Sequence, residues 1–499
     1  MTDDGVTPGQ TRRATLAGAA AAAAAVGLAR HSLAGASSTN PFIVVDPGGQ
    51  GDYTNVEVAV AATPAGSTIF VRRGTYVIND SLRPKAGVRI VGEGFGTVIR
   101  AKAGFNKNPF FIESDHVVLE SLNIDGNRAN QQTNKSNVDF QGITGGRVIN
   151  CWVHDAGGYN IVCYPGGSDI IVSGNRVYDA TQDGIEMMGT SYATICGNAV
   201  SGCGNGIQLW NNTGDAAHNA VVGNTVRRSP NMGIVVQDGA HDNVISGNTV
   251  DGSGVNGIFI GNGGGTTTNP ANGNLVTGNT VTGSASAGIR LNGVSECVVS
   301  QNLVRSNGQH GIWLRYSEAC AVNGNTATHN AASGIRVEGY SGSPTRAATV
   351  DGNVARNNGQ SQVGDGVSVY GPSQQIAVSG NVCTDSQAAR TQRHGVSFED
   401  PTSNSDDVLF SANLVNGNAG QGLAIKSQPA KTHSVPFRKF AAAVGATETA
   451  VAHGLSYAPQ AVTVTMRSPG TIWQSKAADA TNVYLTADAA GRKADVIAG

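Results

Sequence analysis

The sequence predicts an all-β protein whose main part is a parallel β-helix, a solenoid of stacked coils with two or three short strands in each. The first observation is a phrase that recurs between about residues 170 and 425, at steps of 22 to 32 residues. The second is the composition, since 68 of 499 residues are Gly and only 14% are charged. Gly inside a helix costs about 1 kcal/mol relative to Ala, which excludes a helical bundle. No strict Gly-X-Y period is present, which excludes collagen.

Residues 1–38 predict a twin-arginine export signal. Arg12 and Arg13 precede an Ala-rich apolar run, and small residues follow at 34–37. This order of a paired arginine, an apolar stretch and a small-residue cleavage region is typical of such signals. The alternative is a disordered Ala-rich tail. The apolar run is too short for a permanent membrane span, so we expect a secreted, extracellular protein with no membrane partner.

The recurring phrase has two halves, each marked by Gly. The first half is a Gly-Asn pair, found at 174–175, 197–198, 223–224, 247–248, 278–279, 324–325, 352–353 and 380–381. Asn302 and Asn413 occupy the same position without the Gly. The second half is Gly followed by Ile, Val or Leu, found at 184–185, 206–207, 233–234, 257–258, 288–289, 311–312, 334–335, 366–367, 395–396 and 422–423.

The Gly that opens the second half of the phrase is called the second Gly of its coil. After it, apolar residues alternate with polar ones, as in Ile185 and Met187 or Ile207 and Leu209. This period of two directs one face of each strand into a continuous core. Asn at a repeated turn position can take left-handed geometry and bond the Asn of the neighbouring coils, which predicts an Asn ladder. Cys297 and Cys320 fall at equivalent positions and should stack on adjacent coils, either as thiols or as a disulfide.

The opening turns carry a family resemblance. They include Gly51-Asp52-Tyr53-Thr54, residues 66–71, Gly74-Thr75-Tyr76, residues 91–94 and residues 124–127. On these motifs, residues 41–430 resemble the right-handed parallel β-helix proteins of the pectate lyase-like superfamily. The resemblance implies a short helix that caps the open end of the solenoid, and residues 55–62 fit it.

A composition change at residues 428–436 indicates a linker, and the repeat does not continue beyond it. Alternating strands are predicted at 461–465, 471–473, 482–486 and 493–497. We therefore predict a small C-terminal β-sandwich over residues 437–499. It could cap the last coil, bind sugar or support a homotrimer, and capping is the default because an uncovered strand edge promotes aggregation.

The core of a solenoid is sealed, so function is expected on side chains that project from one outer face across several coils. The strand after each second Gly offers such a face, and two groups of functional residues occur along it. The first group is Tyr159, Tyr164, Asp183, Glu186, Gln208 and Trp210. Paired carboxyls suit glycoside hydrolysis, and aromatic rings suit sugar faces. The alternative is a solvated strand face, since Asp before Gly is common in turns.

The second group is Arg290, His310, Trp313, Arg315, Arg336, Glu338, Asp365, Tyr370, His394 and Glu399. Stacked arginines suit an acidic sugar, because they neutralise a uronate carboxylate and make the C5 proton more acidic. His310 or Tyr370 would then remove that proton, leading to β-elimination or epimerisation. The alternative is an exposed ladder in which Arg315 and Arg336 pair with Glu338 and Glu399.

Three activities known among similar proteins were compared by motif. Secreted alginate C5-epimerases carry Tyr-Gly-Phe-Asp-Pro-His on the corresponding strand, where this chain has residues 159–164. Tyr159 is kept, but Val162 and Tyr164 replace the Asp and His of that motif. The triple-Asp signature of polygalacturonases is absent, and residues 309–312 match only their Gly-His-Gly segment. A pectate lyase type of calcium site needs clustered Asp or Glu, and no clear one is evident.

The predicted function is that of a secreted lyase that acts on a uronic-acid polysaccharide by β-elimination. Two alternatives remain: a glycoside hydrolase or transglycosylase that uses Asp183 and Glu186, and a non-catalytic glycan-binding or tail-spike-like module. The seven Cys lack a paired Cys-x-x-Cys pattern, so no metal site is predicted; no cofactor is expected, with calcium left open. The net charge of −2 favours no nucleic-acid partner.

Overall fold

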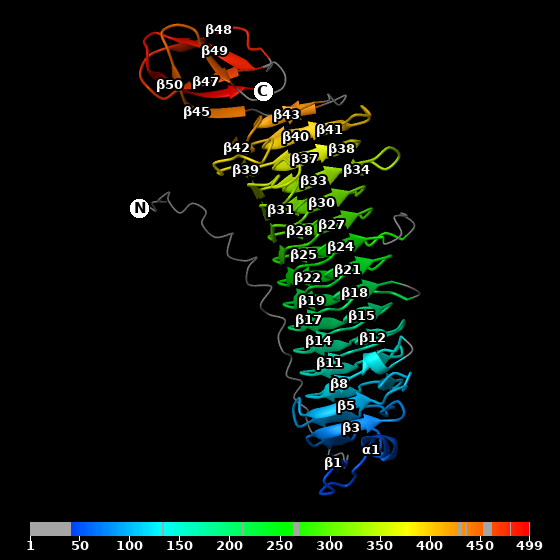
Figure 1. Ribbon diagram of the computed structural model, residues 1–499. Coiled ribbons are helices and arrows are strands. Elements are labelled where there is room, and N and C mark those ends of the chain that lie inside the picture. The colour runs from blue at the N-terminus through cyan, green and yellow to red at the C-terminus, as the bar shows by residue number, and fades with distance from the viewer. Residues whose placement is uncertain are drawn as a thin grey trace, which may run out of the picture. The chain divides into compact units, whose positions relative to one another are not determined.

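The computed structural model describes residues 41–131, 134–211, 214–262, 269–426, 432–434, 437–452, 462–479 and 481–498. The predicted export signal and part of the predicted linker lie outside these residues. From β1 to β44 the chain winds through successive coils, and each coil adds one strand to each of up to three parallel sheets (Figure 1).

Within the described residues, three parallel sheets form the solenoid. Sheet A has 17 strands: β1 (Phe42–Val45), β2 (Thr68–Val71), β4 (Arg89–Gly92), β7 (Val118–Glu120), β10 (Arg147–Ile149), β13 (Ile171–Ser173), β16 (Thr194–Cys196), β19 (Ala220–Val222), β22 (Val244–Ser246), β25 (Leu275–Thr277), β28 (Val298–Ser300), β31 (Ala321–Asn323), β34 (Thr345–Arg346), β35 (Thr349–Asp351), β38 (Ser373–Ser379), β41 (Asp406–Ser411) and β44 (Thr432–Ser434). Sheet B has 14 strands: β3 (Gly74–Ile78), β5 (Thr97–Ala101), β8 (Asn123–Asp125), β11 (Trp152–His154), β14 (Arg176–Tyr178), β17 (Ala199–Ser201), β20 (Thr225–Arg227), β23 (Thr249–Asp251), β26 (Thr280–Thr282), β29 (Leu303–Arg305), β32 (Thr326–Thr328), β36 (Val354–Arg356), β39 (Val382–Thr384) and β42 (Leu414–Asn416). Sheet C has 13 strands: β6 (Phe110–Ile112), β9 (Val138–Phe140), β12 (Ile161–Cys163), β15 (Ile185–Met188), β18 (Ile207–Trp210), β21 (Ile234–Gln237), β24 (Ile258–Gly261), β27 (Ile289–Asn292), β30 (Ile312–Arg315), β33 (Ile335–Glu338), β37 (Val367–Tyr370), β40 (Val396–Glu399) and β43 (Leu423–Ile425).

The helix expected near residues 55–62 is present as α1 (Val56–Ala62). Asn55 caps it, because its Oδ1 accepts hydrogen bonds from the backbone N–H of Glu57 at 2.7 Å and of Val58 at 3.1 Å. The helix buries Val56, Ala59 and Val60 and contacts β1, β2 and β3. It therefore covers the first coil, as the family resemblance implies. A short 3₁₀ helix, η1 (Arg128–Asn130), is the other helix among the described residues.

The Asn ladder is confirmed. It is formed by Asn175, Asn198, Asn224, Asn248, Asn279, Asn302, Asn325, Asn353, Asn381 and Asn413. Asn198 shows the pattern: its Oδ1 accepts from the N–H and the Nδ2 of Asn175 at 2.9 Å, and its Nδ2 donates to the carbonyl of Val172 at 2.9 Å. These buried amides are thus paired, which avoids the free-energy cost of a buried polar group without a partner.

The left-handed residue at this turn is the one before the Asn, which corrects the prediction for Asn itself. Gly174 and Gly197 have φ of 68° and 64°. Where the Gly is missing, Gln301 and Ala412 take φ of 57° and 53°. The Gly of the second half is required for a different reason: a Cβ on Gly206 would lie 2.3 Å from Cγ1 of Val226. One column of glycines therefore supplies backbone geometry, and the other supplies space for the next coil.

The described residues from Phe437 onward form two antiparallel sheets of three strands each. Their strands are β45 (Phe437–Val444), β50 (Arg492–Ala498) and β47 (Val462–Met466), then β46 (Thr449–Ala452), β49 (Asn482–Ala487) and β48 (Ile472–Lys476). Val444, Val451, Leu485 and Val496 pack together between them. The four predicted strands are found, but β45 and β46 were missed because both segments contain several Ala residues, which have low β-propensity.

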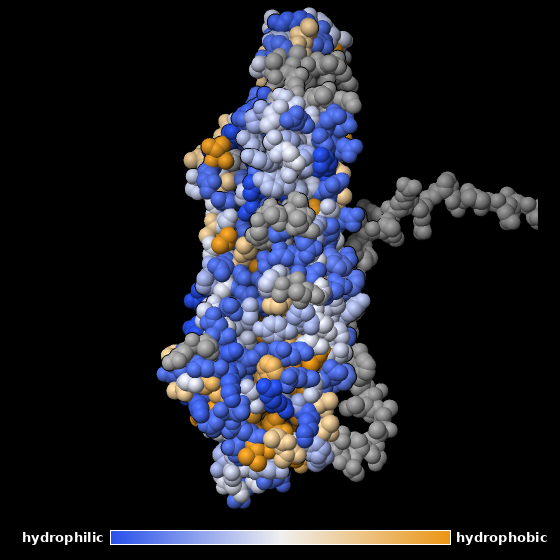
Figure 2. All heavy atoms as spheres, turned by 90° about the vertical axis from the view of Figure 1, so that its right-hand side faces the viewer, coloured by the Kyte–Doolittle hydropathy of each residue, from blue (hydrophilic) through white to orange (hydrophobic). Residues whose placement is uncertain are grey.

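The surface carries no large apolar patch on the face seen in Figure 2, where hydrophobic residues form small separate groups among hydrophilic ones. Among the described residues, no helix is long and apolar enough to pass through a lipid bilayer. Cys297 and Cys320 lie on neighbouring coils as free thiols and form no disulfide. The other five cysteines are also free thiols.

Candidate active site

One column of outward-facing side chains runs along sheet C. In register, it contains Phe111, Asp139, Val162, Glu186, Gln208, Val235, Phe259, Arg290, Trp313, Arg336, Ser368, Ser397 and Ala424. Neighbouring members are about 4.8 Å apart, the spacing of paired strands. Carboxyl and amide groups lie at one end of this column, and arginines lie further along it.

Two more columns flank it. The residue before the Gly of the second half of the phrase, or before Asn160 in the coil of β12, forms the first flanking column: Tyr159, Asp183, Asn205, Met232, Asn256, Ala287, His310, Ser333, Asp365, His394 and Gln421. The last residue of each strand contributes Met188, Trp210, Gln237, Gly261, Asn292, Arg315, Glu338, Tyr370 and Glu399. The structure therefore places the predicted site residues on one sheet, with Tyr159 and Tyr164 at the two ends of β12.

The carboxyl cluster is defined as Asp139, Tyr159, Tyr164, Asp183, Glu186 and Gln208. At its centre, Glu186 is fully buried although it projects from the outer side of the sheet. Its Oε1 accepts a hydrogen bond from Nε2 of Gln208 at 3.0 Å, whereas its Oε2 is buried without a hydrogen-bond partner. Asp183 is 6% exposed, and its Oδ1 accepts from the backbone N–H of Asn205 at 3.0 Å. No ion pair involves either carboxyl among the described residues.

Burial raises the pKa values of Glu186 and Asp183 by different amounts. It raises the pKa of Glu186 to about 8, and the nearby charge of Asp183 adds to that shift. Burial also raises the pKa of Asp183, but only to about 6. Near pH 7 Glu186 therefore holds a proton while Asp183 is mostly ionised. Two neighbouring carboxyls with different protonation can act as an acid and a base, or as an acid and a nucleophile.

Asp139 is a third carboxyl of this cluster that sequence reasoning missed. It lies two strands from Glu186 in the same column, is 3% exposed, and has its pKa raised to about 6 by burial. Its carboxylate accepts from Nδ2 of Asn108 and from Nε2 of Gln141. Its coil lacks the Gly-Ile phrase, reading Asn137-Val138-Asp139 instead. Alternation of Val138, Asp139 and Phe140 was the signal that could have found it.

The arginine cluster is defined as Arg290, Trp313, Arg315, Arg336 and Glu338. The guanidinium carbons of Arg290 and Arg315 lie 4.7 and 5.2 Å from the Trp313 ring centroid. Glu338 is the shared carboxylate, with Oε1 at 3.4 Å from Nε of Arg315 and Oε2 at 3.2 Å from Nε of Arg336. The predicted pairing of both arginines with Glu338 is therefore found, while Glu399 pairs instead with Lys426 at 2.9 Å.

His310 is held in a way that does not suit a base. Burial, followed by the charge of Arg336, lowers the pKa of His310 to about 3. Its Nδ1 accepts the backbone N–H of Ser333 at 3.2 Å, so the neutral ring carries its proton on Nε2. The ring packs edge-to-face on Trp313 at 5.0 Å between centroids. We assign it a packing role beside the arginine cluster.

The remaining members of the second predicted group have structural partners. Asp365 is bound by Arg393 at 2.7 Å and by Ser397 at 2.5 Å. His394 accepts the backbone N–H of Gln421 at its Nδ1. Tyr370 lies under Arg336, with 4.2 Å between the guanidinium carbon and the ring centroid. Of these three residues, Tyr370 is the one whose side chain contacts the arginine cluster.

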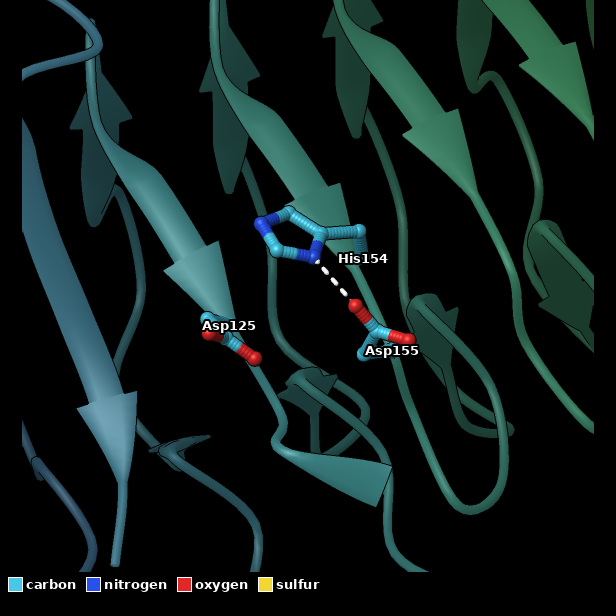
Figure 3. A group of neighbouring side chains, drawn as sticks. All are labelled: Asp125, His154 and Asp155. Atoms are coloured by element: carbon cyan, nitrogen blue, oxygen red, sulfur yellow. Dashed lines mark hydrogen bonds and ion pairs between the residues drawn. The ribbon is translucent and has the colours of Figure 1, made fainter. Parts of the chain in front are cut away.

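A separate group on sheet B has residue types that bind metal ions. Asp125, His154 and Asp155 lie close together, and the imidazole of His154 points at Asp155 (Figure 3). Nδ1 of His154 lies 2.7 Å from Asp155, and its Nε2 lies 2.8 Å from Oδ1 of Asn123. Asp125 pairs with Arg100 at 2.7 Å. Both ring nitrogens and the Asp125 carboxylate thus have protein partners, so the group is a hydrogen-bonded network.

Comparison with protein families identifies the fold. The model described as "Right handed beta helix region" matches residues 86–250 and 205–383, which together are more than half of the chain. The chain belongs to the right-handed β-helix family. The right-handed parallel β-helix predicted from the sequence is therefore confirmed. A comparison of the whole sequence with curated proteins found no match.

Solved structures that are similar to this chain include phage proteins and a bacterial module. A variant tailspike protein of E. coli bacteriophage HK620, bound to a hexasaccharide, is 12% identical with a TM-score of 0.55, covering 89% of this chain and 88% of that one. Gene product 12 of bacteriophage phi29 is 15% identical with a TM-score of 0.58, covering 68% and 51%. The A-module of a mannuronan C-5 epimerase of Azotobacter vinelandii is 16% identical with a TM-score of 0.45, covering 76% and 92%. At these low sequence identities, the similarity of this β-helix protein to the two phage proteins shows a shared fold only.

Proposed function

We propose that this β-helix protein is a polysaccharide-cleaving enzyme that hydrolyses glycosidic bonds at the carboxyl cluster. The observation that carries the proposal is a pair of neighbouring buried carboxyls, Glu186 and Asp183, with no cationic partner among the described residues. Burial raises the pKa of Glu186 further than that of Asp183, which favours opposite protonation of the two acids. Glu186 would donate its proton to the leaving glycosidic oxygen. Asp183 would activate water or attack the sugar carbon as a carboxylate.

The flanking residues suit a sugar substrate. Tyr159 and Tyr164 are half-buried and stand at the two ends of β12, while Trp210 follows Gln208 on β18. Aromatic rings offer flat apolar surfaces to pyranose faces. In the structure, Gln208 binds Oε1 of Glu186 and helps to bury it. Substrate binding would therefore require the Gln208 side chain to turn aside.

Two further lines support a carbohydrate substrate. The family neighbour from bacteriophage HK620 was solved with a bound hexasaccharide. The predicted twin-arginine signal would carry the enzyme to the extracellular space, where polysaccharides are found. A homotrimer formed through residues 437–499 remains a prediction.

We favour hydrolysis over the β-elimination predicted from the sequence. Elimination needs a base beside the arginines, and Nδ1 of His310 is already occupied by Ser333. Tyr370 is the alternative base, since Arg336 lies over its ring. Hydrolysis needs a protonated acid with a nearby carboxylate, and the different upward pKa shifts of Glu186 and Asp183 support these two roles.

A product assay distinguishes the two reactions and the binding-only alternative. The full-length protein is incubated with a panel of neutral and acidic polysaccharides, and reducing ends and ultraviolet absorbance are measured together. Hydrolysis releases reducing ends alone, whereas elimination also creates an absorbing double bond. Reducing ends without absorbance, abolished in Glu186→Gln, are expected. Glycan binding with neither product would overturn the enzymatic proposal in favour of a binding module.

A further inference from the structure

The arginine cluster has more positive charge and more hydrogen-bond donors than its surroundings can match. Arg290, Arg315 and Arg336 bring three guanidinium groups to three successive strands, and Glu338 is the carboxylate that pairs with them. Arg290 has no carboxylate partner among the described residues. Its Nη2 donates to a neutral acceptor, Oδ1 of Asn292, at 3.2 Å. The cluster therefore carries two unbalanced positive charges.

Two buried nitrogen donors in this cluster, Nε of Arg290 and Nε1 of Trp313, lack an acceptor. Nε of Arg315 has only Oε1 of Glu338, at 3.4 Å and outside hydrogen-bond geometry. The side chains of Arg315 and Arg336 are only 27% and 18% exposed, so water screens their charge poorly. Burial and the charge of Arg315 also lower the pKa of Arg290. Holding cations this close together costs free energy unless an anion compensates for it.

The cluster lies on the same outward column as Glu186. Arg290 is four strands along from Glu186, through Gln208, Val235 and Phe259. At the usual strand spacing this separation is about 19 Å. Val235 and Phe259 make the stretch between the two clusters apolar. A chain of sugars lying along sheet C would meet the acid at one end and the arginines at the other.

We infer that the arginine cluster is a binding subsite for the acidic group of an anionic glycan, at a distance from the site of cleavage. This inference rests on the proposed function, since it names the substrate class of the same face. A carboxylate or a sulfate would accept hydrogen bonds from Arg290 and Arg315, because planar guanidinium groups bind oxyanions in a bidentate manner. Trp313, between these two arginines, would contact the sugar ring.

Binding is measured with the full-length Glu186→Gln variant, so that turnover does not interfere. The probes are dextran, dextran sulfate and polygalacturonate, titrated at physiological salt and followed by calorimetry. We expect at least one of the two anionic polymers to bind ten or more times more tightly than dextran, about 1.4 kcal/mol. Tighter binding of polygalacturonate would identify a carboxylate, and tighter binding of dextran sulfate would identify a sulfate.

The arginine variants then locate the binding. Adding Arg290→Gln should weaken binding of the preferred anionic polymer about tenfold, while the matched control Arg305→Gln should change it less than twofold. Arg305 is exposed and lies on β29 of sheet B, so its replacement by Gln removes the same charge from a different face of the solenoid. Equal binding of neutral and anionic polymers, no binding of either anion, or equal weakening by both variants would overturn the inference. Failure of Glu186→Gln to abolish hydrolysis would instead overturn the proposed function alone.

Discussion

The carboxyl cluster and the arginine cluster lie along the same face of sheet C, yet burial affects their charge in different ways. Glu186 and Asp183 have no cationic partner, so burial shifts their pKa values upward and Glu186 stays neutral near pH 7. Arginine cannot lose its proton at this pH, so the arginine cluster keeps its charge and shares one carboxylate. A carboxyl can thus become a proton donor in a place where an arginine can only bind an anion.

The comparison also shows which polar residues of this face are structural. Asp365 and Glu399 occupy flanking positions of the same sheet, but they have direct ion-pair partners in Arg393 and Lys426. Oε2 of Glu186 and Nε of Arg290, in contrast, are buried without a hydrogen-bond partner. Buried hydroxyls such as that of Ser229 also lack partners, so a site is indicated where a missing partner coincides with a charged side chain on the outer face.

Replacement of Glu186 tests the carboxyl cluster most directly. Glu186→Gln should lower kcat about a thousandfold, because the amide cannot donate the proton that the leaving group needs. The loss is measured as reducing ends released at saturating substrate.

The matched control is Glu399→Gln, which removes a carboxylate from the same sheet but from an exposed ion pair. This variant should retain wild-type activity. A Glu186→Gln variant that is equally active would mean that Glu186 is only a buried structural acid.

The same replacement should stabilise the protein at high pH. The pKa of Glu186 is about 8 in the folded protein against an ordinary value of 4.5. Between these values the unfolded chain releases a proton that the folded protein retains, so stability falls as pH rises from about 4.5 to 8. Glu186→Gln should therefore gain up to about 5 kcal/mol over wild type at pH 9, seen as a higher midpoint of thermal unfolding. At pH 4 the two proteins should unfold at similar temperatures, and a constant difference across pH would contradict the assignment.

The pH profile should report both acids of the carboxyl cluster. Activity requires ionised Asp183 and protonated Glu186, so kcat/KM should peak near pH 7 and fall about tenfold per pH unit beyond the two limits. The limits are expected near pH 6 and pH 8. Initial rates between pH 4 and 10 give the profile. A flat response between pH 5 and 9 would exclude this pair.

The arginine cluster should affect substrate binding more than the chemical step. Arg290→Gln should raise KM for an acidic polysaccharide about tenfold, because its guanidinium has no carboxylate partner to neutralise it. Arg336→Gln should raise KM only about threefold, since Glu338 already neutralises that charge. Steady-state kinetics on one acidic substrate compare the two variants. A larger effect for Arg336, concentrated in kcat, would restore the lyase interpretation with Tyr370 as base.

Much of the fold could be predicted from the repeat, because each Gly-Asn pair and each second Gly has a local cause. Gly197 has a left-handed φ, Gly206 leaves room for Val226, and Asn198 continues a ladder. The same periodicity placed Asp183, Glu186, Arg290 and Trp313 on one face. Asp139 was missed because its coil lacks the phrase. The role of His310 could not be predicted, because Ser333 reaches its ring from the next coil.

The sequence by itself determined the coil length, the ladder and the residues that share the outer face, since these depend on periodicity and on local backbone preferences. Only the tertiary structure decided which of those residues are charged, neutral or paired. Protonation depends on burial and on neighbours such as Gln208 beside Glu186, which come from other coils. Ion pairing depends equally on neighbouring coils, as for Arg315, which reaches Glu338 on the next coil. A repeat predicts where side chains point, and packing between coils decides what chemistry they can perform.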